Sequence, residues 1–281
     1  MASIGLQNSL RVVRAAVPGL YLDGGTLGEI LLPGRYAPKG AAAGTQLDVF
    51  IYRDSEDRLV ATTEKPLATV GQFAFLKVVS SNRQMGAFLD WGLSKDLLLP
   101  IREQARPVTV GERVVAAVFL DEHTGRIVAS TRLNRHLGTT APDYAKGDAV
   151  SLIIAGKTPL GFKAIVANAH WGLLYGSELS TALRIGEGHT GYVRAVRPDG
   201  KIDLGLDPAG YKRVAPLTDL IVAELEARGG RIELDDQSTP DAIRDTFHTS
   251  KKAFKQATGA LYRARRIRFT EPGIELVKSA L

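Results

Sequence analysis

Two stretches of the sequence, YLDGGTLGEILLP at residues 21–33 and FLDWGLSKDLLLP at residues 88–100, are copies of one pattern. They align position by position at an offset of 67 residues. After one inserted residue the likeness continues, so that RLVATT at 58–63 aligns with RIVAST at 126–131. Agreement over this length in one register indicates that the chain is built from tandem copies of one structural unit.

A third copy of the pattern is fainter. GLLYGSEL at 172–179 follows the second LLLP segment by 75 residues, and KIDLGL at 201–206 follows RIVAST by the same distance. The repeat therefore predicts three domains of similar size and a distinct C-terminal one. We place these four domains at residues 1–66, 67–140, 141–212 and 213–281.

Each unit has the pattern of a small β domain. In the second unit, FAFLKVV at 73–79 and GERVVAAVFLDE at 111–122 are rich in β-forming residues, and a His-Thr-Gly turn separates the latter from RIVAST. About five short strands fit into each unit, which suits a five-stranded closed barrel of the OB-fold type because closure removes exposed sheet edges. The predicted fold class is mostly β, with tandem OB-fold barrels and a small α/β module at the C-terminus.

The second unit resembles a known RNA-binding domain. The run GAFLDWG, LLLP and GERVVAAVFLDEHTGRIVAS is similar to the S1-type domain, an OB-fold repeated in the first small-subunit ribosomal protein. The first unit departs most from this pattern, with an Ala- and Gly-rich insert at residues 39–44 and few basic residues, and none of our candidate contact residues lies in it. The third unit has Tyr175 where the others have proline.

The order of the domains is more specific. Three such units followed by DDQSTPDAIRDTFHTSKKAFKQATGALYRARRIRF, residues 235–269, resemble the conserved virulence factor B family of bacterial RNA-binding regulators. This resemblance implies a cytoplasmic bacterial protein that binds RNA, influences gene expression and is not an enzyme.

The C-terminal module has the pattern of a winged helix-turn-helix. We expect a helix at 215–230 ending at two glycines, a short strand at 231–234 and a second helix at 240–247 capped within Ser-Thr-Pro. Thr249 or Ser250 caps a third helix, in which Phe254, Ala257 and Leu261 form one buried stripe. RRIRFTEPGIELV at 265–277 is typical of a strand, turn and strand, the wing.

The net charge is concentrated in this module. Residues 248–281 hold eight basic and two acidic residues, an excess equal to the +6 of the whole chain, whose isoelectric point is about 9.5. A local excess favours an anionic partner, although a solvated helix face would also have this pattern. We predict phosphate contacts, which position the protein without reading sequence. The candidates are Lys251, Lys252, Lys255, Arg263, Arg265, Arg266 and Arg268.

Aromatic and basic residues of the barrels are candidates for binding a single strand, because OB-folds stack bases on aromatic rings beside a positive groove. In the second unit these are Phe75, Phe88 and Trp91, with Lys77, Lys95, His123 and Arg126. In the third unit they are Phe162, Trp171 and Tyr175, with Lys163 and Lys201. Core packing is the alternative for each ring. Trp91 and Trp171 are favoured because each precedes a loop glycine, where a large ring is harder to bury.

Signals of other protein classes are missing from the sequence. It has no cysteine, no apolar run long enough for a membrane helix, no secretory signal, no phosphate-binding loop and no nucleophile elbow. The five histidines are scattered without metal-ligand spacing. We therefore expect no cofactor, no metal, no catalytic residues, no membrane partner and a cytoplasmic location.

These observations lead to the hypothesis of a protein that binds single-stranded RNA through several weak modules and regulates gene expression. Two alternatives stay open. One is a transcription regulator that binds duplex DNA through the winged helix, and the other is a ribosome-associated factor whose basic module docks on ribosomal RNA or protein.

Overall fold

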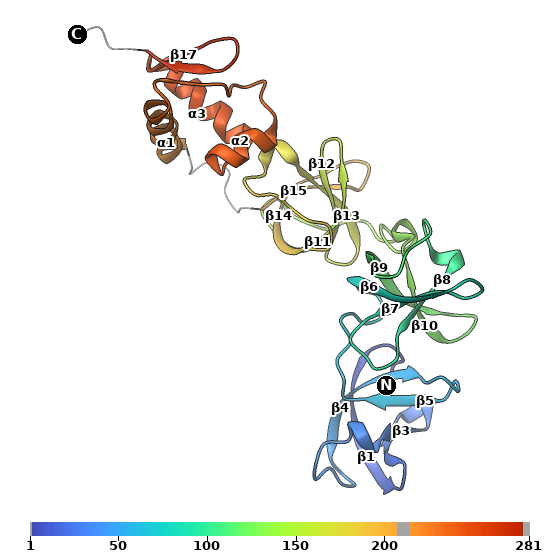
Figure 1. Ribbon diagram of the computed structural model, residues 1–281. Coiled ribbons are helices and arrows are strands. Elements are labelled where there is room, and N and C mark those ends of the chain that lie inside the picture. The colour runs from blue at the N-terminus through green and yellow to red at the C-terminus, as the bar shows by residue number, and fades with distance from the viewer. Residues whose placement is uncertain (1, 207–213, 278–281) are drawn as a thin grey trace. The chain divides into compact units, whose positions relative to one another are not determined.

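The computed structural model describes residues 2–206 and 214–277, and it shows a mostly β chain with three α-helices near the C-terminus (Figure 1). The chain divides into two compact units, residues 1–137 and 138–281. The first holds two five-stranded sheets, and the second holds one five-stranded barrel and the helical module. The predicted fold class is confirmed, whereas the four domain ranges stay a prediction.

The first sheet is a closed barrel with strand order β1-β2-β3-β5-β4. Leu31 of β3 and Val60 of β5 form the parallel bridge that closes it. The strands are β1 (Gln7–Ala16), β2 (Gly19–Asp23), β3 (Glu29–Pro33), β4 (Gln46–Arg53) and β5 (Leu59–Thr62), with short 3-10 helices η1 (Gly25–Leu27) and η2 (Gly34–Tyr36).

The second sheet has the order β10-β9-β6-β7-β8, and no ladder pairs β8 with β10. Its strands are β6 (Phe73–Asn82), β7 (Gly86–Asp90), β8 (Leu97–Pro100), β9 (Arg113–Asp121) and β10 (Arg126–Ser130), with η3 (Ile101–Glu103) and η4 (Leu133–Arg135). The second sheet therefore has the strand order of the other two and lacks only the closing ladder. Leu98 and Val128 stand where the repeat places Leu31 and Val60, and both line a cavity at the seam instead of forming a bridge.

The third sheet is again a closed barrel, in the order β11-β12-β13-β15-β14. A parallel ladder between β13 and β15 closes it, and Leu174 and Val193 are among its fully buried core residues. The strands are β11 (Ala149–Thr158), β12 (Gly161–Val166), β13 (His170–Tyr175), β14 (Gly188–Val196) and β15 (Ile202–Gly205), with η5 (Gly176–Glu178).

One glycine position recurs in all three sheets and explains part of the sequence repeat. Gly19, Gly86 and Gly161 have φ values of +150°, +131° and +148°. A Cβ at each would lie 2.0 to 2.2 Å from the carbonyl oxygen of the strand beside it. Only glycine allows both that backbone conformation and that close approach.

The C-terminal module is a winged helix, as predicted. It consists of α1 (Val214–Ala227), β16 (Arg231–Ile232), α2 (Pro240–Phe247), α3 (Lys251–Arg263), β17 (Ile267–Phe269) and β18 (Ile274–Leu276), and the three strands pair in the order β16-β18-β17. The hydroxyl of Thr239 accepts a hydrogen bond from the Ala242 N–H, and that of Ser250 accepts one from the Ala253 N–H. Ser250, not Thr249, is therefore the cap of α3.

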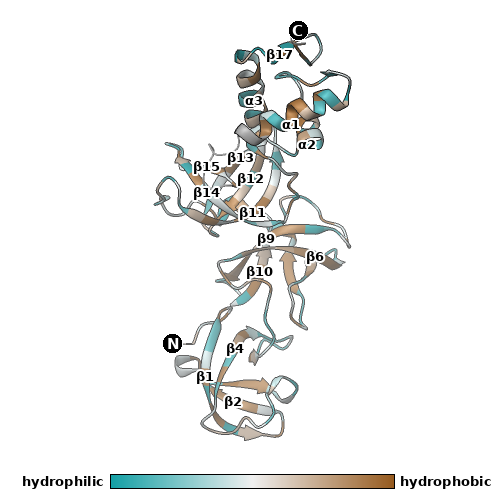
Figure 2. Ribbon diagram, turned by 90° about the vertical axis from the view of Figure 1, so that its left-hand side faces the viewer, coloured by the Kyte–Doolittle hydropathy of each residue, from teal (hydrophilic) through white to brown (hydrophobic). Residues whose placement is uncertain are grey.

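Each sheet and the helical module have an apolar core, and in Figure 2 the strands carry much of the hydrophobic colour. The second half of strand β4, residues 49–52, is buried on both faces. Val49 and Ile51 belong to the first barrel's core, whereas Phe50 and Tyr52 on the other face pack with Trp91 of the second sheet. Two-sided burial of β4 thus joins the two sheets of the first unit. No helix within residues 2–206 and 214–277 is both long and apolar enough to span a membrane.

Candidate nucleic-acid interface

A cavity of about 220 Å³ lies in the first unit, where the β4–β5 turn of the first barrel meets the second sheet. Four of the predicted contact residues line it together: Phe88, Trp91, Lys95 and Arg126. The first barrel contributes Tyr52, Arg53 and Ser55. The remaining lining residues are Met85, Asp96, Leu97, Leu98, Ile127 and Val128.

Phe88 is placed at this cavity by the alternation of strand β7. It stands opposite Leu98 of β8, and both side chains are only partly buried because they point away from the core that Ala87 and Leu89 fill. A second, more open hollow of about 410 Å³ shares Leu98 and Arg126 with the first. The two hollows together make a groove across β7, β8 and β10.

Trp91 is not an exposed stacking platform, and the expectation that its loop position would keep the ring accessible is wrong. The side chain is 2% exposed and packs edge-on against Phe50, with ring centroids 5.6 Å apart. Its indole N–H donates to the Lys95 carbonyl at 2.6 Å. The apolar outer face of β4 covers the ring, so Trp91 forms part of the cavity wall.

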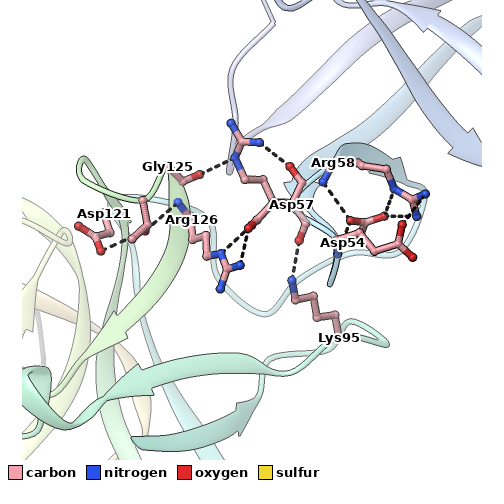
Figure 3. A network of polar contacts seen from close by, with 10 residues as sticks. Asp54, Asp57, Arg58, Lys95, Asp121, Gly125 and Arg126 are labelled. Atoms are coloured by element: carbon pink, nitrogen blue, oxygen red, sulfur yellow. Dashed lines mark hydrogen bonds and ion pairs between the residues drawn. The ribbon is translucent and has the colours of Figure 1, made fainter. Parts of the chain in front are cut away.

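A polar network joins the β4–β5 turn to the rim of the cavity (Figure 3). Both oxygens of Asp57 accept hydrogen bonds from Arg126, from Nε at 2.7 Å and from Nη2 at 2.6 Å. Arg53 donates from Nε to the Gly125 carbonyl at 3.2 Å and from Nη1 to the Asp57 carbonyl at 2.6 Å. Lys95 Nζ donates to the Arg53 carbonyl at 2.7 Å. The cations at this rim are therefore held by anionic or carbonyl oxygen atoms of the protein itself.

The network shifts the pKa values of its members. Hydrogen bonding to Arg126 lowers the pKa of Asp57. Burial lowers the pKa of Lys95, and the nearby Arg126 charge lowers it further. Burial raises the pKa of Tyr52 to about 12. At neutral pH the rim therefore carries the charged Asp57–Arg126 pair, and the hydroxyl of Tyr52, another residue that lines the cavity, is neutral.

Three other predicted residues of the second unit lie outside the cavity. Phe75 and Lys77 are on β6, and the guanidinium carbon of Arg113 lies 5.9 Å from the Phe75 ring centre. His123 is an exposed residue of the β9–β10 turn. The structure does not bring these three together with Phe88.

The first barrel has an equivalent of Phe88 that the sequence analysis missed. Tyr21 pairs with Leu31 as Phe88 pairs with Leu98, and the 67-residue offset already aligned these positions. The Tyr21 ring is covered by Arg14, whose guanidinium carbon is 3.8 Å from the ring centre. Arg14 is itself paired with Glu29 at 2.7 Å. The repeat was therefore the signal that could have identified Tyr21.

In the third barrel Lys163 occupies the equivalent position, opposite Leu173. Its Nζ lies 3.5 Å from the centre of the Trp171 ring, a cation–π contact, and burial lowers its pKa. Tyr175 donates its hydroxyl hydrogen to Asp203 at 3.3 Å. Trp171 and Tyr175 are partly exposed and on one face of β13, as a single-strand platform requires.

Two further predicted residues of this barrel are less suited to binding. Phe162 stands opposite Leu174 and packs against the barrel core, so the prediction that it contacts bases is not supported. Lys201 is exposed and paired with Asp199 at 3.0 Å. Phe162 lies on the inner face because the strand alternation that exposes Lys163 turns its neighbour inward.

On the winged helix, the buried stripe of α3 leaves the basic residues outside, as predicted. Lys252 is paired with Glu178 at 2.7 Å and Lys255 with Asp236 at 3.3 Å. Arg268 of the wing is paired with Glu275. Within residues 2–206 and 214–277 we find no ion pair for Lys251, Arg263, Arg265 or Arg266.

An exposed aromatic pair beside these arginines was also missed. Tyr262 near the end of α3 and Phe269 of β17 have ring centroids 5.3 Å apart, and they are 54% and 44% exposed. The sequence did contain a signal for Tyr262. It is an aromatic residue of α3 that comes directly after Leu261 and lies outside the buried stripe of Phe254, Ala257 and Leu261. Among the described residues there is no group of three or more potential metal ligands.

Comparisons with known proteins give matches at both the N-terminal and the C-terminal end of the chain. Residues 219–276 match the model of the CvfB-like winged helix domain, and residues 4–64 match that of the S1 domain. The uncharacterized protein YitL of Bacillus subtilis is 30% identical over 224 residues, covering 77% of this chain and 74% of that protein. Conserved virulence factor B of Staphylococcus aureus is 23% identical over 242 residues, covering 84% and 80%.

The chain belongs to the conserved virulence factor B family. Membership confirms the resemblance inferred from the repeat and the basic tail. The S1 match falls on the first unit and confirms that it is an S1-type domain, although its sequence departs most from the S1 pattern of the second unit. S1 and winged-helix domains support nucleic-acid binding as the general property of this member of the family.

A solved structure has been found that aligns along nearly the whole chain. It is a multidomain protein with nucleic acid binding domains from Streptococcus pneumoniae, 23% identical, covering 98% of each chain with a TM-score of 0.40.

Proposed function

We propose that this protein binds single-stranded RNA and regulates gene expression in the cytoplasm without catalysing a reaction. The observation that carries the proposal is the position of Phe88, a partly exposed ring on β7 in a groove whose rim holds Lys95 and Arg126. An aromatic platform beside cations is what a single strand needs, because bases stack on the ring and phosphates meet the cations.

The shape of the groove favours a single strand over a duplex. The cavity beside Phe88 has about 220 Å³, which suits one unstacked base and not a double helix. Tyr175 and Trp171 of the third barrel and Tyr262 and Phe269 of the winged helix add partly exposed rings near basic side chains. Unstacked bases can reach such rings, whereas the paired bases of a duplex are stacked on one another.

A transcription regulator acting on duplex DNA is the second candidate. It is favoured by the unpaired Lys251 and by Arg263, Arg265 and Arg266 on α3 and the start of the wing, among the described residues. Such a protein would place α3 in the major groove. A ribosome-associated factor is a third possibility that the same basic surface suits.

The test is fluorescence anisotropy of the full chain with a labelled single-stranded RNA, a single-stranded DNA of the same sequence and a duplex DNA of equal length, across a salt series. We expect the single-stranded RNA to bind most tightly. The slope of log affinity against log salt, about 0.7 per neutralised phosphate on a single strand, counts the phosphate contacts. Tighter binding of the duplex would replace this proposal with the transcription-factor candidate.

A further inference from the structure

The cavity between the β4–β5 turn and the second sheet has walls of two kinds. Phe88, Leu98 and Met85 make an apolar side, and Arg126 and Lys95 stand at its charged rim. Its volume of about 220 Å³ exceeds the roughly 150 Å³ that holds a benzene ring in a buried apolar cavity. It therefore has room for one planar base, and Lys95 and Arg126 are among the residues that would surround that base.

The carboxylate of Asp57 holds Arg126, one of the residues that line the cavity. Its two oxygens accept hydrogen bonds from Nε and Nη2 of Arg126, the fork by which arginine also binds phosphate. The pair is accessible, with the Arg126 and Asp57 side chains 39% and 53% exposed. An incoming phosphate could thus exchange with the carboxylate without opening a buried contact.

We propose that this cavity is the seat of one nucleotide of the bound strand, with its base against Phe88 and its phosphate on Arg126 in place of Asp57. This inference rests on the proposed function and deepens it. The first barrel enters the binding site through Tyr52, Arg53 and Asp57, although none of the candidate contact residues named from the sequence lies in it. Asp57 is then a resident anion that sets how strongly the strand is held.

The remaining contacts allow the carboxylate to leave while the turn stays in place. Arg53 holds the Asp57 carbonyl and the Gly125 carbonyl, and Lys95 holds the Arg53 carbonyl. None of these bonds uses the Asp57 side chain. Exchange therefore requires only rotation of that side chain away from Arg126.

The test compares Asp57→Asn with Glu56→Gln in the full chain. Both remove one negative charge from the same turn, but Glu56 pairs with Arg58 and not with Arg126. Asparagine tolerates the positive φ of 63° at position 57. We expect D57N to bind a single-stranded RNA oligomer about threefold more tightly than wild type, because the phosphate no longer displaces an ion pair. E56Q should change the affinity much less than D57N does, by only the small amount that loss of any one nearby negative charge causes.

A double variant and a base-free ligand locate the effect. D57N should give no gain in an Arg126→Gln background, because the gain acts through that guanidinium. Inorganic polyphosphate has charge but no base. It should displace the labelled RNA from wild type less well than an unlabelled RNA of equal charge does. The same order of the two competitors is expected for D57N. Uridine 5′-monophosphate tests whether the cavity binds a nucleotide of a strand or a free nucleotide. It should bind more weakly than the oligomer.

The outcomes distinguish failure of this inference from failure of the proposed function. If wild type binds no single strand, the proposed function and this seat are both overturned. If wild type binds RNA but D57N and E56Q change affinity equally, or D57N still gains in the R126Q background, the seat alone is overturned. Equal competition by polyphosphate excludes a base in the cavity, and tighter binding of the monophosphate than of the oligomer excludes a strand nucleotide.

Discussion

At the scale of single residues, one position of the repeat carries three different side chains. Tyr21, Phe88 and Lys163 each pair with a leucine on the adjoining strand, on the outward face of their sheets. Arg14 covers Tyr21, and Lys163 lies over Trp171. Phe88 lines an open groove, so of the three it is best placed to take a base.

Replacing Phe88 by leucine should weaken binding of single-stranded RNA by roughly 1–3 kcal/mol, the usual contribution of one stacked base. Leucine keeps an apolar side chain at the groove and removes the flat ring. Anisotropy titration measures the loss. Phe75→Leu is the matched control, because that ring lies on β6 away from the cavity and should change affinity little. Equal losses in the two variants would remove Phe88 from the binding site.

His136 should make the first unit less stable in mild acid. Its Nε2 is buried without a hydrogen-bond partner among the described residues, its ring packs on Phe119 at 4.7 Å, and burial lowers its pKa below the usual value of about 6.5. Because the folded-state pKa is the lower one, the stability from the neutral ring is present above pH 6.5 and is lost as pH falls through the folded value.

The measurement is the melting temperature by calorimetry at pH 7 and pH 5 for wild type and His136→Phe, a variant that keeps an aromatic ring beside Phe119. The drop between the two pH values should be smaller in the variant. An identical drop would show that His136 does not account for any of the acid sensitivity.

At the scale of elements, the short helices of the winged module depend on their caps. Ser250 begins α3 by accepting the Ala253 N–H, and α3 carries Phe254 and Leu261 into the core of the module. Strand β17 then sets Phe269 beside Tyr262 on the opposite side from that core. The cap lies at the start of α3, and the aromatic pair joins the end of α3 to β17, so the two can be tested separately for stability and binding.

Ser250→Ala should destabilise the winged helix by about 1 kcal/mol, because the Ala253 N–H loses its partner at the helix start. Thermal unfolding measures this change. Ser250→Asp should restore most of the stability, since aspartate also accepts at this position and its charge suits a helix N-terminus. If the alanine variant is as stable as wild type, the cap does not contribute.

Tyr262→Leu should weaken binding of single-stranded RNA by roughly 1–3 kcal/mol if one base stacks there. Binding to duplex DNA should not change, because a duplex contacts this surface through its phosphates and the arginines are retained. Comparing the two ligands by anisotropy is the test. Loss of duplex binding alone would indicate that the winged helix acts on paired DNA.

At the scale of the whole molecule, the chain distributes its binding groups over several modules. The barrels offer Phe88 with Arg126 and Trp171 with Lys163, whereas the excess positive charge lies after residue 247. Tethered modules that are weak alone bind tightly together, since the second contact forms at a high effective concentration.

The affinity for single-stranded RNA should therefore rise steeply with oligomer length until two modules can be bridged, and then level off. A series of oligomers of one repeating sequence, titrated at fixed salt, measures this. The double variant Phe88→Leu with Trp171→Leu should lose most of the steep rise. A gradual increase in proportion to length, unchanged in the double variant, would instead indicate independent charge contacts.

Much of the fold could be predicted, because the patterns that specify it lie among residues close together in the sequence. The repeat, the β-forming stretches, and the turn and capping residues are patterns among neighbours in sequence, and they identified the barrels, the wing and the start of α2. The missing ladder between β8 and β10 could not be predicted, because Leu98 and Val128 match residues that pair in the first barrel.

The sequence by itself determined the family, the tandem barrels, the winged helix and the stripe that leaves the α3 lysines outside. Only the tertiary structure decided that Trp91 is buried, that Asp57 holds Arg126 and that the first barrel shares a cavity with the second sheet. Arg126 and Asp57 are 69 positions apart, and no periodicity along the chain reports such a contact. It forms because β4 is apolar on both faces and must bury its outer face against a neighbour.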